Sequence, residues 1–142
     1  MLVWSPLAGG LMSGKYRRDG QPTHRTRQLT DWGEAPVRDR EALYRTVDVL
    51  ARIGQARGVS APQVALAYLL ERPAVTSPAI GARTAEQLAD NLAAAELVLT
   101  AQEREWLDNV SELPLIFPYW HQANTGSDRL SPADLTLLGR HL

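Results

Sequence analysis

The sequence predicts an α/β fold built from parallel strand–helix units. Short β-favouring runs occur at 2–4 and 74–82, and each one leads into a turn that contains glycine. Long stretches with helical periodicity follow both runs. The order strand, loop, helices, strand, helices is typical of a parallel sheet, because parallel strands need a helical crossover between them.

The composition fits one ordinary globular domain over residues 1–142. Hydrophobic residues make up 44% of the chain and charged residues 22%, and the formal net charge is −1. This balance gives no reason to expect a nucleic acid or a membrane surface as partner, so any anion site must be local. The absence of cysteine excludes disulfides and thiolate metal sites. Because "MLVWSPLAGG" also lacks the features of a signal peptide, we expect a cytoplasmic protein.

The first third of the chain predicts a strand, a turn, a loop and a helix. Residues 2–4 are expected to end a buried strand that feeds the glycine-rich segment 5–16. Residues 16–38 are polar and show no sustained period, which predicts a long loop. An amphipathic helix is expected from about 40 to 57, where apolar residues recur at Leu43, Val47 and Leu50 and where Gly58 can end it.

Capping boxes predict three further helices. They are Ser60 with Gln63, Thr84 with Gln87, and Thr100 with Glu103. The first precedes "VALAYLL", which is apolar nearly all round and should be deeply buried. For the other two, the inward faces are expected to carry Leu88, Leu92, Ala95, Trp106, Leu107 and Val110. The tail from 114 is irregular, with a short helix expected after Ser131 and Pro132.

The segment "SPLAGGLMSGKY" resembles a phosphate-binding loop but departs from it at one position. Gly9, Gly14 and Lys15 fit the pattern G-x-x-x-x-G-K-[ST], whereas Tyr16 stands where a triphosphate loop needs a Ser or Thr hydroxyl for magnesium. A phenol on a longer, rigid side chain cannot take that role. The segment therefore favours another way of holding a phosphate.

The segment "IGARTAEQLADN" (80–91) carries the second anion-binding pattern. Arg83 precedes the Thr84 cap, so its guanidinium is expected beside a helix N-terminus that already favours an anion. Gln87 and Asn91 lie one turn apart on the same helix face. A guanidinium and two amides could together recognise an adenosine that bears a 2′-phosphate. The alternative is that Arg83 is solvated, Gln87 only completes the cap and Asn91 faces water.

These two segments, with "VSAPQVALAYLLERP" between them, resemble the seventh and eighth strand-to-helix regions of the aldo-keto reductases. The resemblance implies the C-terminal part of a (β/α)8 TIM barrel: the last two strand–helix units plus extra helices, incomplete as a barrel. The cofactor-binding units would cover 1–113 and a C-terminal tail 114–142. It also implies that NADP(H) binds at the carboxyl ends of the strands, because that is where the family holds its cofactor.

The resemblance assigns cofactor contacts residue by residue. Trp4 matches the ring that stacks on the nicotinamide, and Lys15 matches a lysine near the phosphates. Arg25 aligns with a basic residue that some members use. From the residues alone, Trp4 could equally be a core side chain, and Lys15 and Arg25 would be solvated charges. The turn along the ribose and pyrophosphate corresponds to Ser5, Pro6, Leu7, Ala8 and Gly9.

The resemblance likewise assigns the adenosine end of the cofactor to the second segment, residues 80–91. Gly81 and Arg83 match the adenosine phosphate site, with Gly81 letting the backbone come close. Gln87 and Asn91 match the adenine contacts. Asp90 matches an acidic position that some members use on the adenine side, and it could also simply face solvent.

The family's catalytic groups have no match in this chain. Aldo-keto reductases pass a hydride to a carbonyl while a Tyr gives the proton, assisted by Lys, Asp and usually His. Those groups come from strands that would precede residue 1, and Tyr16, Tyr44, Tyr68 and Tyr119 do not fit the motif. We therefore assign no catalytic residue, and expect the cofactor-binding portion of an NADP-dependent oxidoreductase whose small-molecule carbonyl substrate is met in the complete enzyme. This chain alone should be inactive.

Other interpretations stay open. A non-catalytic NADP(H)-sensing or regulatory subunit, like the related potassium-channel β subunits, would share these segments, and a helical interaction module would keep the sequence without binding nucleotide. Two strands alone leave uncovered edges, which could lead to self-association. The aromatic residues 117–120 could line a substrate pocket or pack the tail. No metal site is expected, because His24, His121 and His141 lack ligand spacing.

Overall fold

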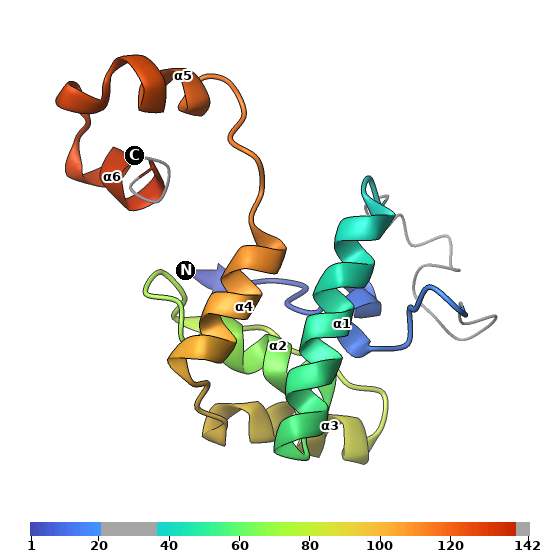
Figure 1. Ribbon diagram of the computed structural model, residues 1–142. Coiled ribbons are helices and arrows are strands. Elements are labelled where there is room, and N and C mark those ends of the chain that lie inside the picture. Colours follow the sequence, from blue (N-terminus) through green and yellow to red (C-terminus); the bar gives the residue numbers. More distant parts are fainter. Residues whose placement is uncertain (21–36, 139–142) are drawn as a thin grey trace. The chain divides into compact units, whose positions relative to one another are not determined.

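The computed structural model describes residues 1–20 and 37–138 (Figure 1). The chain divides into two compact units, Met1–Ser111 and Glu112–Leu142. The first contains β1 (Leu2–Val3), η1 (Ala8–Ser13), α1 (Arg40–Arg57), α2 (Ala61–Leu70), β2 (Ser77–Pro78), α3 (Ala85–Leu92), η3 (Ala93–Glu96) and α4 (Ala101–Ser111). The second contains α5 (Tyr119–Thr125), η4 (Ser127–Arg129) and α6 (Pro132–Leu138). Among the described residues, no helix is long and apolar enough to span a membrane.

The two strands pair in parallel, as the α/β order predicts. Leu2 lies opposite Ser77 and Val3 opposite Pro78. The expectation of a buried strand is wrong for this structure, because Leu2 and Trp4 are each 76% exposed. Within the described residues the sheet has only these two strands, so few neighbours are available to cover their side chains.

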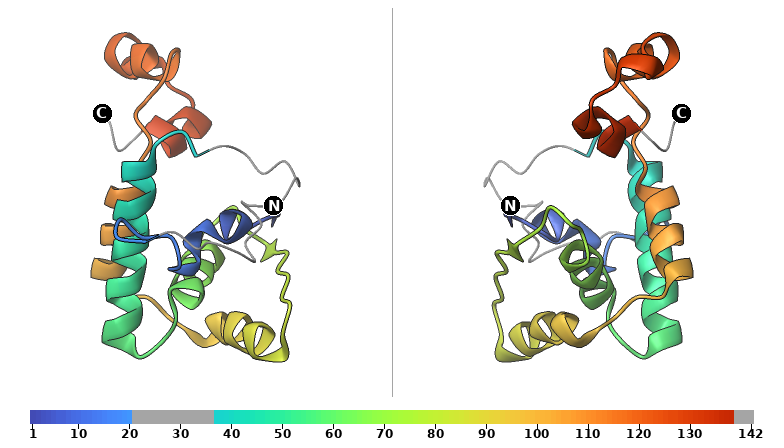
Figure 2. Two further views of the ribbon diagram at one scale, coloured as in Figure 1. Left: turned by 90° about the vertical axis from the view of Figure 1, so that its right-hand side faces the viewer. Right: turned by 90° about the vertical axis from the view of Figure 1, so that its left-hand side faces the viewer.

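Three helices build the core of the first unit. Helices α1 and α4 lie side by side, and α1 also packs against α2 (Figures 1 and 2). Residues 64–67 of α2 are buried, which confirms the prediction from "VALAYLL". Burying the larger of these side chains, Val64 and Leu66, contributes about 1.5–3 kcal/mol each. The buried cluster consists of Leu50, Ile53, Val64, Ala65, Ala67, Leu99 and Leu107.

The helix ends follow the predicted chemistry. Gly58 ends α1 in the left-handed region, with φ of 69°. At α4 the capping box is complete: the Glu103 backbone N–H donates to Thr100 Oγ1 at 3.2 Å, and the Thr100 N–H donates to Glu103 Oε2 at 2.7 Å. Glu103 also joins α4 to α1, because Arg57 donates to both of its carboxylate oxygens at 2.8 Å.

The rotation of α3 differs from the prediction. Leu88 is 43% exposed and Leu92 is 56% exposed, and Ala95 is exposed as well, so the expected inward stripe faces outward. The buried side of α3 and η3 instead carries Asn91 and Ala94. The same helix makes a polar contact with α2 through Asp90, which helical periodicity does not reveal.

The second unit contains the predicted short helix and one that was not predicted. Helix α6 follows Ser131, whose Oγ accepts from the Asp134 backbone N–H at 3.3 Å. Helix α5 lies over "YWHQANT" within the stretch expected to be irregular. Its sequence has no N-terminal capping side chain, which explains why the pattern gave no signal.

Candidate functional site

The segment after β1 forms a tight turn with unusual backbone angles. Gly9, Gly10 and Gly14 have φ of 63°, 94° and 79°, and Ser5 and Ala8 have φ of 51° and 48°. Positive φ at a residue other than glycine costs on the order of 1–3 kcal/mol, and such conformations concentrate at functional sites. Hydrogen bonds across the turn hold it, including Ala8 N–H to Ser5 O at 2.8 Å.

Lys15 folds back over this turn. A Cβ added at Gly10 would lie 3.2 Å from Lys15 Nζ, so the ammonium occupies the space that a side chain at position 10 would need. The same Nζ lies 5.6 Å from the centroid of the Tyr16 ring, within cation–π range. Tyr16 is buried, and its hydroxyl has no hydrogen-bond partner among the described residues. The sequence pattern did not predict this contact between the Lys15 ammonium and the Tyr16 ring.

The electrostatics of Lys15 connect the turn to the second predicted segment. Partial burial lowers the pKa of Lys15, and the positive charge of Arg83 lowers this pKa further. The two cations are therefore near enough to repel each other although 67 residues separate them in the sequence. Two cations that repel each other in this way favour an anion beside them.

The start of α3 forms one half of the predicted capping box. The Gln87 backbone N–H donates to Thr84 Oγ1 at 3.2 Å. The Gln87 side chain reaches one residue further back than a capping box requires, and its Oε1 accepts from the Arg83 N–H at 3.0 Å. A Cβ added at Gly81 would meet no atom within 4 Å, so the backbone there faces open space. Arg83 and Gln87 are both exposed.

Asp90 binds the start of α2, and Asn91 is buried. Asp90 Oδ2 accepts from Ser60 Oγ at 2.6 Å and its Oδ1 from Gln63 Nε2 at 2.7 Å, so the carboxylate binds the start of α2 and does not simply face solvent. The Gln63 side chain thereby leaves the predicted capping box half formed. Asn91 is 9% exposed, so it neither faces water nor shares an open face with Gln87.

The arrangement suits the phosphate end of an adenosine 2′-phosphate better than its base. Lys15, Arg83, the open backbone at Gly81 and the helix N-terminus at Thr84 fit an anionic group. Of the two amides predicted to contact the adenine base, Gln87 is exposed and Asn91 is buried. Trp4 is exposed, as a stacking ring must be, and Ser5, Pro6, Leu7 and Gly9 are half-buried in the turn. Arg25 lies outside the described residues, as do His24 and His141.

One cluster with a tyrosine hydroxyl joins α2 to α4. Tyr68 Oη and Arg72 Nη2 each donate to Asp108 Oδ1 at 2.6 Å, and the Arg72 guanidinium lies 3.9 Å from the Tyr68 ring centroid. Burial raises the pKa of Tyr68, and the hydrogen bond to Asp108 raises this pKa further. No lysine takes part in these contacts, and we assign the cluster a structural role.

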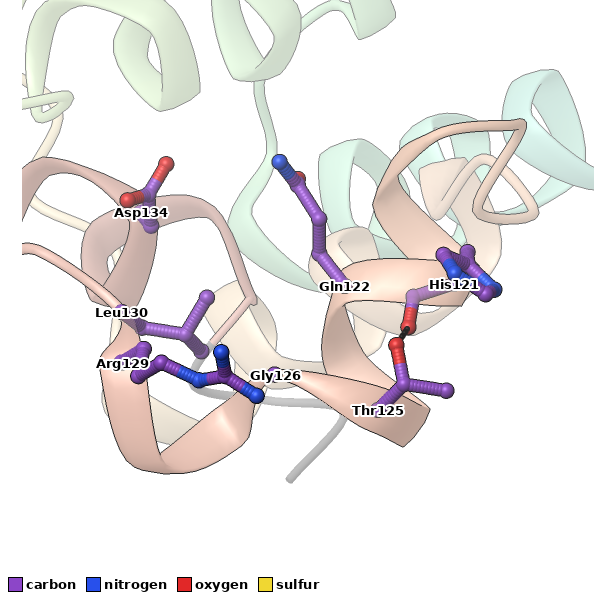
Figure 3. A pocket seen from close by; sticks show the side chains of 7 residues that line it. All are labelled: His121, Gln122, Thr125, Gly126, Arg129, Leu130 and Asp134. Carbon is purple, nitrogen blue, oxygen red and sulfur yellow. Dashed lines mark hydrogen bonds between the residues drawn. The ribbon is translucent and has the colours of Figure 1, made fainter.

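The second unit holds a cavity of about 350 Å³ within its own helices (Figure 3). The aromatic residues 117–120 do not line it; the rings of Phe117 and Trp120 instead form a T-shaped pair, and both also pack against His121. No group of side chains suited to a metal ion occurs in the described ranges 1–20 and 37–138. The cavity is lined by His121, Gln122, Thr125, Gly126, Arg129, Leu130 and Asp134.

The parallel strands and the helices that follow them define an α/β unit, and comparison with known proteins specifies its family. The model of the aldo/keto reductase family matches residues 1–112, so the chain belongs to that family. Over 110 residues it is 36% identical to the Bacillus subtilis protein "Uncharacterized oxidoreductase YrpG", a match that covers 78% of this chain and 31% of that protein.

Two further relatives carry more specific names. The chain is 34% identical over 111 residues to an Escherichia coli O157:H7 L-glyceraldehyde 3-phosphate reductase, with 75% of this chain and 32% of that protein covered. It is 30% identical over 113 residues to a Schizosaccharomyces pombe "Putative voltage-gated potassium channel subunit beta", with 76% and 33% covered. The matched segment thus spans about a third of the length of these curated relatives.

Proposed function

We propose that residues 1–111 bind NADP(H) as part of an aldo-keto reductase that reduces small carbonyl compounds or oxidises the corresponding alcohols. The observation that carries the proposal is the glycine turn with positive φ, over which the Lys15 ammonium lies; the charge of Arg83 lowers the pKa of this lysine. Repulsion between two cations raises the free energy of the empty site, and a ligand that brings one phosphate group to each cation offsets that cost. Membership of an oxidoreductase family supports a dinucleotide as the source of the phosphate.

Each half of the proposed site has its own task. Arg83, Gly81 and Thr84 would hold the 2′-phosphate, and Gln87 would contact the adenine. Lys15 and the turn from Ser5 to Gly9 would lie along the pyrophosphate, and Trp4 would cover the nicotinamide. When bound, the cofactor supplies the hydride. We thus propose cofactor binding for these 142 residues and assign no proton donor among them.

The test is a fluorescence titration of this chain with NADPH and NADH. Arg83→Ala should weaken NADPH binding by about 1–3 kcal/mol, the scale of a charge-assisted hydrogen bond, and leave NADH nearly unchanged because NADH lacks the 2′-phosphate. Arg45→Ala, which removes the same charge from the exposed face of α1, is the matched control and should change neither affinity. Equal losses for both nucleotides in Arg83→Ala would remove Arg83 from the 2′-phosphate.

A second function is favoured by one relative. The Schizosaccharomyces pombe protein is named as a channel subunit, which makes nucleotide sensing without turnover a defined alternative for the same site. Both functions require NADPH binding, so the titration does not separate them. An assay of carbonyl reduction by the protein that contains these residues separates the two functions, since a sensor binds NADPH without consuming it.

A further inference from the structure

The cavity of the second unit lies in a part of the chain that the family model does not cover. All of the residues that line it lie between 121 and 134, in α5, η4, α6 and the turns between them, whereas the family model matches 1–112 (Figure 3). Its volume of about 350 Å³ is within the range of small-molecule sites. The chemistry of the lining residues therefore has to indicate which ligand the cavity suits.

Two of the lining side chains carry opposite charges. Arg129 ends η4, and Asp134 lies in the first turn of α6. Figure 3 shows the Arg129 guanidinium beside Gly126 and the Asp134 carboxylate away from it, and in the described part of the chain Arg129 pairs with Asp128 and not with Asp134. Opposite charges that line one cavity without neutralising each other favour a ligand that carries both signs.

The Asp134 carboxylate is held at one oxygen only. Its Oδ2 accepts from Ser131 Oγ at 2.6 Å and from the Ser131 backbone N–H at 3.0 Å. The Ser131 hydroxyl and then its N–H lower the pKa of Asp134, so the group is ionised at neutral pH. Asp134 Oδ1 accepts no hydrogen bond from residues 1–20 or 37–138, which leaves it for a ligand that donates one.

Arg129 is likewise engaged through one of its nitrogens. Its Nε donates to Asp128 at 3.4 Å, a long contact between two exposed side chains that contributes little. Its two terminal nitrogens donate to no group within the described residues. They belong to the planar fork of N–H groups that binds a carboxylate through two parallel hydrogen bonds.

The Gln122 amide adds an unsatisfied acceptor to the wall of the cavity. Gln122 Oε1 is buried and has no hydrogen-bond partner among the described residues. A buried acceptor without a donor is unfavourable, and a turn of this side chain toward a ligand N–H satisfies it. The cationic end of the ligand should therefore carry N–H groups, as a primary ammonium does. Leu130 lines the cavity with apolar surface.

From these groups we propose that the cavity of the second unit binds a small zwitterion of the α-amino-acid class. Asp134 Oδ1 and Gln122 Oε1 accept from the ligand ammonium. The Arg129 fork donates to the ligand carboxylate, and Leu130 contacts the ligand side chain. No lining residue belongs to 1–111, so this proposal and NADP(H) binding stand or fall separately.

The test is an NMR titration of the 142-residue chain that follows the backbone amide signals of 121–134. The probes are L-leucine, which carries both charges, N-acetyl-L-leucine, which lacks the ammonium, and L-leucinamide, which lacks the carboxylate. L-leucine should bind at least about tenfold more tightly than either derivative, because each derivative loses one charge-assisted contact. Equal binding of all three probes, or no change of these signals with any of them, would overturn the proposal.

Arg129→Gln tests the carboxylate contact. It should raise the dissociation constant of L-leucine about tenfold and leave that of L-leucinamide unchanged, because L-leucinamide has no carboxylate to lose. The matched control is Asp128→Asn, which changes a neighbouring charge that does not line the cavity and should not weaken L-leucine. An unchanged affinity for L-leucine in Arg129→Gln would contradict the proposed orientation and overturn the proposal.

Gln122→Leu tests the ammonium contact without removing a group that supports the fold. Replacing an unsatisfied buried amide by an apolar side chain of similar size should leave the thermal stability of the chain unchanged or raise it. The dissociation constants of L-leucine and L-leucinamide should rise about tenfold, whereas that of N-acetyl-L-leucine should stay the same. A folded Gln122→Leu variant that binds L-leucine as tightly as the unaltered chain would overturn the proposal.

Discussion

Lys15 shows how a local motif and a distant charge combine at one residue. Its predicted place near a phosphate follows from the glycine pattern, and the structure adds the Tyr16 ring and the charge of Arg83. Burial and the like charge of Arg83 both disfavour the ammonium and lower the pKa of Lys15.

We predict that saturation with 2′,5′-ADP or NADPH raises the pKa of Lys15, because a bound phosphate offsets the charge of Arg83. The measurement is an NMR titration of the lysine side-chain carbon and nitrogen signals. Arg83→Ala serves as the control: it should raise the pKa of Lys15 in the free protein, since it removes one of the two causes of the depression. A pKa of Lys15 that is the same with and without nucleotide would contradict the proposed site.

At the scale of helices, polar side chains with two tasks decide the packing. Glu103 caps α4 and also binds Arg57 of α1. The sequence predicts the capping box, because both partners lie within one turn of helix. It does not predict the link to Arg57, which depends on how two helices pack. The same holds for Gln63, whose amide binds Asp90 of α3 where the sequence pattern predicts a bond to its own cap.

The Glu103 contacts predict an acid-sensitive stability. The hydrogen bonds from Arg57 hold the pKa of Glu103 at about 2, below its ordinary value of 4.5. The stabilisation is therefore complete above the ordinary value and is lost as the pH falls towards 2. In Glu103→Gln the free energy of unfolding at neutral pH should drop by about 1.5–3 kcal/mol. The decrease of this free energy as the pH falls should also become smaller, because the variant has no carboxylate to protonate at position 103. Urea unfolding at a series of pH values measures both effects.

Glu105→Gln on the exposed side of α4 is the control for this prediction. Glu105 accepts only an exposed hydrogen bond from Gln102 at 3.1 Å among the contacts described, so its loss should cost little. If the unfolding free energy of Glu103→Gln keeps the full pH dependence of the unaltered chain, the Arg57 pair does not supply it.

For the molecule as a whole, sequence patterns predicted most elements but not which side of α3 packs inward. Capping residues and helical spacing located α1 to α4, because those signals are local. Leu88 and Leu92 gave a clear apolar stripe, yet both are exposed, and Asp90 of the same helix binds α2. For the candidate site, the sequence pattern predicted the cap of α3 at Thr84 but not the burial of Asn91, because burial depends on which side of the helix packs inward.

The whole chain should bind nucleotide without turning it over. With NADPH and an activated aldehyde at stoichiometric protein, we expect no loss of NADPH absorbance, because none of the four tyrosines matches the family's proton donor. The positive control is NADPH binding in the same preparation, measured by fluorescence. Measurable turnover that Arg83→Ala reduces would place a proton donor within these 142 residues.

The bonds between Ser60, Gln63 and Asp90 also bear on how this chain can change by descent. Loss of the Asp90 carboxylate leaves two donors at the start of α2 without their acceptor, at a cost of about 1–3 kcal/mol for each donor that water cannot reach. A single substitution at any of the three positions is therefore unfavourable, whereas a joint replacement by three mutually compatible side chains is not. Across diverging copies of this gene, positions 60, 63 and 90 should covary as one unit.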